Sequence, residues 1–145
     1  MSENGAGRLY TPALLNLAVD LANYPLDDTL PRQGEAVSRT CGSRLAMGLA
    51  CDADGAIERI GMQVSACAVG QAAAAVFAAG AAGRDHGDVV AAEHAIADWL
   101  AGGPDADWPG IDAIAAAREH PGRHEAILLP WRAARAALSN ASAAE

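Results

Sequence analysis

The most informative part of the chain is residues 38–71, which read SRTCGSRLAMGLACDADGAIERIGMQVSACAVGQ. Apolar residues alternate with polar or small ones over 44–51 and again over 59–64, which is the period of a half-buried strand. Between them, Asp54-Gly55 is a strong hairpin signal, because both central positions of such a turn tolerate a positive φ. Together with a short strand over 35–40, this stretch predicts three antiparallel strands with one apolar face.

Two cysteines stand at the ends of this strand region. Cys41 lies in a turn before the second strand, and Cys67 lies where the strand pattern gives way to an alanine-rich helix over 68–82. A thiol at a helix N-terminus is favoured as thiolate by unpaired backbone N–H groups and the helix dipole. The pair therefore predicts soft-metal or sulfur chemistry. Cys51 shares the apolar strand face and is predicted to be a core residue.

Helical spacing predicts helices on both sides of this region. Thr11 and Pro12 are suited to the start of a helix that ends at Pro25. Its predicted apolar stripe comprises Leu14, Leu15, Ala18, Val19 and Leu21. Asp88 is predicted to cap a second helix, whose inner face comprises Val89, Ala92, Ile96 and Trp99.

A short helix is expected over 107–118, with Ile111 and Ile114 inward. The last helix is expected to begin close to Pro130, because proline is tolerated only in a first turn. Its predicted buried stripe is Leu128, Trp131, Ala134 and Leu138. The resulting fold class is α+β: a small three-stranded antiparallel sheet packed against about five helices. We expect one domain over 1–145, with frayed ends at 1–8 and 139–145.

Composition excludes several classes of function. The 145 residues suit one domain, and 52% of them are hydrophobic, which is enough for a core. The net charge of −8 argues against nucleic-acid binding, because phosphates would be repelled. All ten basic residues are arginine, so no lysine is present for Schiff-base chemistry. Three cysteines and a polar N-terminus predict a cytoplasmic protein with reduced thiols and no membrane association.

The stretch from Ser38 to Gln71 resembles the U-type iron–sulfur cluster scaffold family (IscU, SufU and the NifU N-terminal domain). The matching pieces are Thr40-Cys41-Gly42-Ser43, the hairpin Cys51-Asp52-Ala53-Asp54-Gly55, the strand from Ile57 to Val64, and Cys67-Ala68. The resemblance extends to both ends: the helix that runs to Asn23-Tyr24-Pro25, and a last helix from Arg123 to Leu138. It thus places the start of the last helix earlier than the proline rule does.

The chain departs from the family pattern at two positions. The family's third cysteine, at the start of the last helix, is Ala126 in one register and Glu125 in a register shifted by one residue. The aspartate that follows Cys-Gly in the family is Ser43. Both registers leave two thiolates, Cys41 and Cys67, where the family has three.

The resemblance implies a scaffold of the SufE/IscU-like fold, not an enzyme, that receives sulfur from a cysteine desulfurase. The product would pass to a recipient apo-protein or a cluster carrier. Cys41 and Cys67 would hold iron or a transient iron–sulfur cluster, with zinc as an alternative metal. Histidine and carboxylate are competent ligands, so His120, His124 and Glu125 are further candidates in the loop expected to face the thiols. Two chains could also supply four thiolates across a homodimer.

The sequence is also compatible with two alternative functions. In sulfur acceptors of the SufE type, one nucleophilic cysteine accepts a persulfide, and their Cys-x-Ser looks like Cys41-Gly42-Ser43. Cys41 would then be the sulfur-accepting residue, and Cys67 would be dispensable. A degenerate regulatory paralogue would instead keep partner binding and need neither cysteine.

Overall fold

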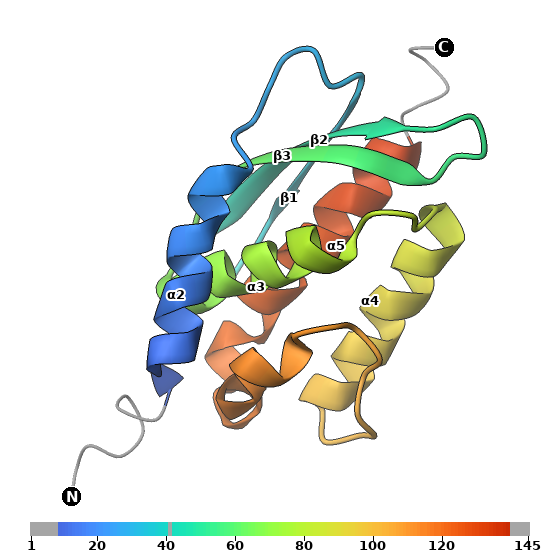
Figure 1. Cartoon of the computed structure of the whole chain (residues 1–145). Helices are drawn as coiled ribbons and strands as arrows, with labels where there is room; N and C mark the ends of the chain where they lie inside the picture. Colours follow the sequence, from blue (N-terminus) through green and yellow to red (C-terminus); the bar gives the residue numbers. More distant parts are fainter. Residues whose placement is uncertain (1–8, 41, 140–145) are drawn as a thin grey trace, which may run out of the picture.

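The computed structural model describes residues 9–40 and 42–139, in which a three-stranded antiparallel sheet lies against helices (Figure 1). The strands are β1 (Arg32–Val37), β2 (Arg44–Cys51) and β3 (Ile57–Ser65), in the order β1-β2-β3. The helices are α2 (Pro12–Asp20), η1 (Leu21–Asn23), α3 (Ala68–Gly80), α4 (His86–Leu100), η2 (Ile111–Glu119), η3 (Pro121–Arg123) and α5 (His124–Ser139), where η denotes a 3-10 helix. The predicted α+β class is confirmed.

The central strand β2 follows the predicted alternation. Leu45, Met47 and Leu49 are fully buried on the face that α5 covers. The first strand spans 32–37 rather than the expected 35–40. Its ladder stops there because the chain turns into the loop 38–43, whose ends are joined by a hydrogen bond from Ser38 N to Ser43 O of 2.7 Å.

The β2–β3 hairpin turns where expected but with a different backbone conformation. Gly55 N donates to Asp52 O at 3.0 Å, so the turn is centred on Ala53 and Asp54. Gly55 has φ = +86°, whereas no non-glycine residue among those described has a positive φ. Asp52 Oδ1 accepts from Asp54 N and Ala56 N, and this side-chain cap supports the turn without a left-handed aspartate.

Helix α3 begins at Ala68, with Cys67 as its N-cap residue, as the change in sequence period predicted. It lies between α2 and α5, and most of its small side chains are buried there. Across the described part of the chain, no helix combines the length and apolar character needed to cross a membrane.

Helix α5 corrects the start expected from Pro130. It begins at His124, so Pro130 lies inside the helix, and the start implied by the family resemblance is right to within one residue. Proline lacks the N–H that would bond to the carbonyl of Ala126. Burial outweighs that loss, because Ile127 and Trp131 are fully buried and the helix packs on β1, β2, α3 and α4.

The close approach of α5 to the sheet depends on Gly34 in β1. A Cβ atom placed at Gly34 would lie 2.6 Å from the carbonyl oxygen of Ala133, where no side chain fits. This close packing involves the later turns of α5, whereas its first turn is joined to the loop 38–43 by hydrogen bonds to Glu125.

Two helix details differ from expectation. Thr11 caps α2 through Leu14 N, as predicted, but Leu15 and Val19 are 44% and 73% exposed. Among the described elements, α2 packs mainly on α3, so the buried stripe is narrower than predicted and centres on Leu14. The cap of α4 is Asp85, not Asp88. Asp88 is the reciprocal partner in a capping box, in which each aspartate accepts from the other's backbone N–H.

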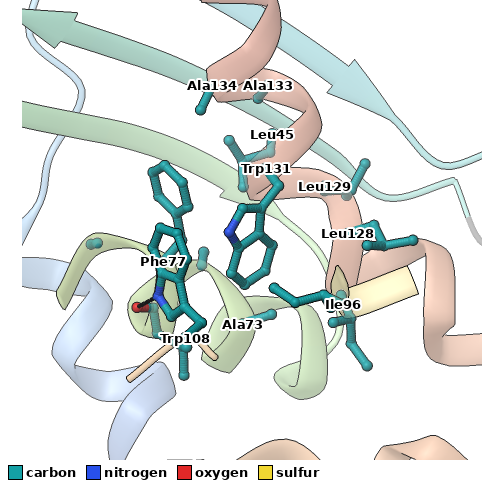
Figure 2. Packing of buried hydrophobic residues seen from close by; sticks show 14 of the residues in the cluster. Leu45, Ala73, Phe77, Ile96, Trp108, Leu128, Leu129, Trp131, Ala133 and Ala134 are labelled. Atoms are coloured by element: carbon teal, nitrogen blue, oxygen red, sulfur yellow. Dashed lines mark hydrogen bonds between the residues drawn. The ribbon is translucent and has the colours of Figure 1, made fainter. Parts of the chain in front are cut away.

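Three aromatic rings form the centre of the helical layer (Figure 2). Trp131 of α5 meets Phe77 of α3 and Trp108 edge to face, with ring centroids 5.5 and 5.2 Å away. Trp108 Nε1 donates to Val76 O at 2.9 Å, which satisfies a polar group buried in this core. The predicted inner faces of α4 and α5 are confirmed, since Ile96 and Trp131 are both fully buried.

Candidate metal and sulfur site

Three segments meet at one end of the sheet, and together they form the candidate site. The first is the loop 38–43, which runs into β2 where Arg44 pairs with Ser65. The second is the junction after Ser65 that leads to Cys67 and α3. The third is the first turn of α5, which is joined to the loop by hydrogen bonds from Glu125. Cys41 lies outside the described residues, but both of its neighbours are described.

Cys67 occupies the position predicted for it. It is the N-cap of α3, with extended backbone angles of −67° and 172°, and its side chain makes no capping hydrogen bond. The thiol is half-buried and free, and it packs against the core. A thiolate here would face the positive end of the α3 dipole, which stabilises negative charge.

Glu125 contacts the loop that leads into Cys41. Its Oε1 atom accepts four hydrogen bonds: from Ser38 Oγ at 3.1 Å, Arg39 N at 3.1 Å, Thr40 N at 3.4 Å and Thr40 Oγ1 at 3.2 Å. All four donors come from three consecutive residues. The carboxylate thus fills the concave side of the loop, in the manner of an anion held by successive backbone N–H groups.

These contacts explain the electrostatics of Glu125. The hydroxyl of Ser38, followed by the backbone N–H and hydroxyl of Thr40, lowers the pKa of this carboxyl below its ordinary value. Hydrogen bonds to the charged form favour ionisation, so the carboxylate is negative at neutral pH. Its Oε2 atom takes no hydrogen bond from the described residues, which leaves one carboxylate oxygen with lone pairs available to accept a hydrogen bond or bind a metal ion.

The two histidines near Glu125 are oriented by backbone contacts. His124 Nε2 lies 3.0 Å from Arg118 O, so this nitrogen carries the proton and donates. His120 ends η2 with its backbone N donating to Ala117 O. Of these three side chains, Glu125 is the one that hydrogen-bonds to the described residues of the loop 38–43.

The positions that replace the third cysteine and the aspartate differ in environment. Ala126 is fully buried, and a Cβ atom at Gly70 of α3 would lie 3.3 Å from its methyl group. Glu125, one residue earlier, points toward the loop. Ser43 is 5% exposed and its carbonyl accepts from Ser38 N, so it closes the base of the loop.

Within residues 9–40 and 42–139, no cluster of three or more His, Cys, Asp or Glu side chains could hold a metal ion. Cys41 lies outside these ranges. Cys51 is half-buried against the core at the far end of β2, which agrees with its expected structural role.

Sequence reasoning missed the partners of Glu125. Ser38 and Thr40 bond to a residue 85–87 positions later, and that separation leaves no periodic signal in the sequence. The available sign was chemical: a polar Ser-x-Thr segment precedes Cys41, and a carboxylate opens the last helix. The burial of Ser38, which is only 1% exposed in the structure, adds to this chemical sign.

Comparison with solved structures identifies the fold of this chain. The N-terminal part of a nitrogen-fixing NifU-like protein from Brucella abortus superposes with a TM-score of 0.84 at 21% identity, over 98% of this chain and 100% of that one. The chain has the fold of the U-type scaffolds. A candidate iron–sulfur cluster assembly scaffold of the SUF system from Fervidobacterium islandicum AW-1 gives 0.79 at 18% identity, over 90% and 97% of the two chains.

A third solved structure, of a hypothetical protein, matches with a TM-score of 0.66 at 17% identity, over 87% of this chain and 96% of that one. No protein-family model and no curated protein matches the sequence. At these identities the likeness shows the U-type fold alone. The chemistry of this chain therefore depends on its own residues.

Proposed function

We propose that this protein is an iron–sulfur cluster assembly scaffold that receives sulfur from a cysteine desulfurase and binds iron or a transient cluster. The observation that carries the proposal is the placement of Cys67 at the start of α3, beside the first turn of α5 that binds the Cys41 loop. Two of the solved structures with this fold are described as NifU-like and as a SUF-system scaffold.

The proposed ligands are the thiolates of Cys41 and Cys67. Thiolate sulfur suits iron and zinc, and a helix N-terminus favours the charged form that binds them. Oε2 of Glu125 is the proposed third ligand, because it is the carboxylate oxygen that the loop does not use. His124 is a further candidate ligand through Nδ1, because its Nε2 donates to Arg118 O and the lone pair of the neutral ring then lies on Nδ1. Iron held by so few protein ligands would exchange readily, which suits transfer to an acceptor protein.

The sulfur step is a transfer between thiols. The Cys41 thiolate attacks the outer sulfur of a persulfide on the desulfurase, forming a new S–S bond while the old one breaks. The desulfurase cysteine leaves as a thiolate, and Cys41 becomes the persulfide. Electrons balance without an external oxidant or reductant. The recipient of the finished product would be an apo-protein or a carrier.

Anaerobic reconstitution with ferrous iron, cysteine and a cysteine desulfurase tests the proposal. The wild type is compared with Cys41→Ser and Cys67→Ser, and with Cys51→Ser as a matched control at the far end of β2. Iron, zinc, sulfide and visible absorption are measured after desalting. We expect a chromophore with matched iron and sulfide in the wild type and the control, and its loss in the other two variants.

A different outcome would identify a sulfur acceptor of the SufE type. In that case no iron is retained, and a persulfide on Cys41 survives Cys67→Ser. If the wild type holds neither iron nor persulfide, the scaffold proposal is wrong and a partner-binding role without cluster chemistry replaces it.

A further inference from the structure

We infer that Glu125 is a positioning residue, which holds the segment leading into Cys41 in a fixed place relative to the helix start that carries Cys67. The inference rests on the proposed function, because the placement of these segments matters only if both cysteines handle iron or sulfur. It assigns to Oε1 of Glu125 a task that is separate from any ligand role of Oε2.

Among the described residues, the loop's own backbone hydrogen bonds lie at its base. Ser38 N donates to Ser43 O at 2.7 Å and Gly42 N donates to Ser38 O at 3.0 Å, and these bonds extend the β1–β2 pairing by one step. The backbone N–H groups of Arg39 and Thr40 lie beyond that base, and both residues are exposed. Glu125 is the partner that the structure gives to both N–H groups.

Glu125 can fix the loop because its own backbone is held by the core. The next two residues, Ala126 and Ile127, are both fully buried. Ala126 lies so close to Gly70 that a Cβ atom there would be 3.3 Å from its methyl group. Since Gly70 is in the first turn of α3, three residues after Cys67, the start of α5 is in contact with the Cys67 helix.

A continuous series of contacts therefore joins the two cysteine-bearing segments. It runs from α3 through Gly70 and Ala126 to α5, and then from Glu125 Oε1 to the segment 38–40. A single carboxylate oxygen makes the last step. Hydrogen bonds to a charged acceptor are about twice as strong as neutral ones, so this oxygen is well suited to the task.

The test uses metal-free protein, so that it does not depend on iron binding. Glu125→Ala is compared with Glu125→Gln, Glu125→Asp and the control Glu119→Gln, which changes an exposed glutamate at the end of η2. Two quantities are measured: amide hydrogen exchange at Arg39 and Thr40, and the alkylation rate of Cys41 relative to Cys67 by mass spectrometry of the same molecules. Cys67 serves as the internal reference, because a general loss of folding would change both thiols.

For Glu125→Ala we expect exchange at Arg39 and Thr40 to be roughly tenfold faster, as for the loss of a charge-assisted hydrogen bond. The Cys41 to Cys67 alkylation ratio should rise as the loop is released. Gln keeps an acceptor oxygen at the same reach and should restore part of the wild-type behaviour. Asp is one methylene shorter and should behave like Ala, and Glu119→Gln should match the wild type.

Unchanged exchange at Arg39 and Thr40 in Glu125→Ala would overturn the inference, as would equal changes at both thiols. If Glu125→Ala does not fold, Thr40→Val removes one donor from an exposed site and should raise the same ratio by a smaller factor. No change in Thr40→Val would then count against it. Wild-type exchange in Glu125→Ala, together with loss of iron retention in the reconstitution experiment, would make Glu125 a ligand only, a result distinct from failure of the scaffold proposal itself.

Discussion

The two loops at opposite ends of β2 are each held by one carboxylate oxygen, but the oxygen comes from different distances along the chain. In the β2–β3 loop, Asp52 Oδ1 accepts from residues two and four positions later. In the β1–β2 loop, the acceptor is Glu125, which lies 85–87 positions away on α5. The first loop is therefore a self-contained turn, whereas the second takes its shape only when the whole fold has formed.

This difference matches the proposed roles of the two loops. A local cap needs no information from the rest of the molecule, and the β2–β3 loop carries no proposed site residue. The loop 38–43 leads into Cys41, and its long-range contact relates it to α3 and Cys67. Changes that act through α5 should therefore affect the loop 38–43 more than the β2–β3 loop.

Removing the central side chain of α5 should have the largest effect. Trp131 is fully buried and packs edge to face against both Phe77 and Trp108, so Trp131→Ala should cost about 3–5 kcal/mol in the free energy of unfolding. Because α5 carries Glu125, amide protection should fall more in 38–40 than in 52–56. Denaturant unfolding and hydrogen exchange measure the two effects. Leu15→Ala, at a 44% exposed position on α2, is the control and should change stability by less than about 0.5 kcal/mol. Equal protection changes in both loops would contradict the dependence on α5.

A matched pair of glycine substitutions compares the loops directly. Gly42 and Gly55 have φ of +71° and +86°, and a Cβ atom at either would meet nothing within 4 Å. Alanine at each position should therefore cost a similar amount, about 1–2 kcal/mol, from backbone strain alone. Only Gly42→Ala alters the loop beside Cys41, so it alone should lower the iron retained per protein after reconstitution. Equal iron retention in the two variants would show that the geometry of this loop is not important for cargo binding.

The extent to which the sequence predicted the structure follows the same division. The strands, the Asp-Gly hairpin and the start of α3 at Cys67 depend on neighbouring residues, and they were found from periodicity and turn chemistry. The φ angles of the hairpin were wrong, because a side-chain cap from Asp52 supports a turn that needs only one left-handed residue. Local patterns thus located the elements better than they gave the backbone detail.

The errors concern residues whose environment is set by distant parts of the chain. Pro130 was expected to start the last helix, but packing on four other elements extends the helix back to His124. Leu15 and Val19 were expected to be buried, but α2 packs mainly on one described helix, α3. The hydrogen bonds between Glu125 and the segment from Ser38 to Thr40 were missed for the same reason, because they join distant parts of the chain. The sequence named Glu125 as a candidate, but its pattern did not identify Ser38 to Thr40 as the residues that Glu125 would contact.

The pH dependence of the loop 38–43 is the smallest expected effect, and it tests the same long-range contact. The pKa of Glu125 is lowered in the folded protein, first by Ser38 and then by Thr40. A lowered folded-state pKa means that the carboxylate contributes stability above its unfolded value, near 4.3, and that this contribution is lost as the pH falls through the folded value. The amide signals of Arg39 and Thr40 should therefore titrate with a midpoint below about 4.3 in metal-free protein.

Asp27, whose pKa is lowered by the backbone N–H and then the hydroxyl of Thr29, supplies a local counterpart at the Thr29 amide. Glu125→Gln should remove the transition at Arg39 and Thr40 and leave that of Thr29 unchanged, whereas a midpoint at or above the ordinary glutamate value would mean that the loop does not stabilise the charged carboxylate.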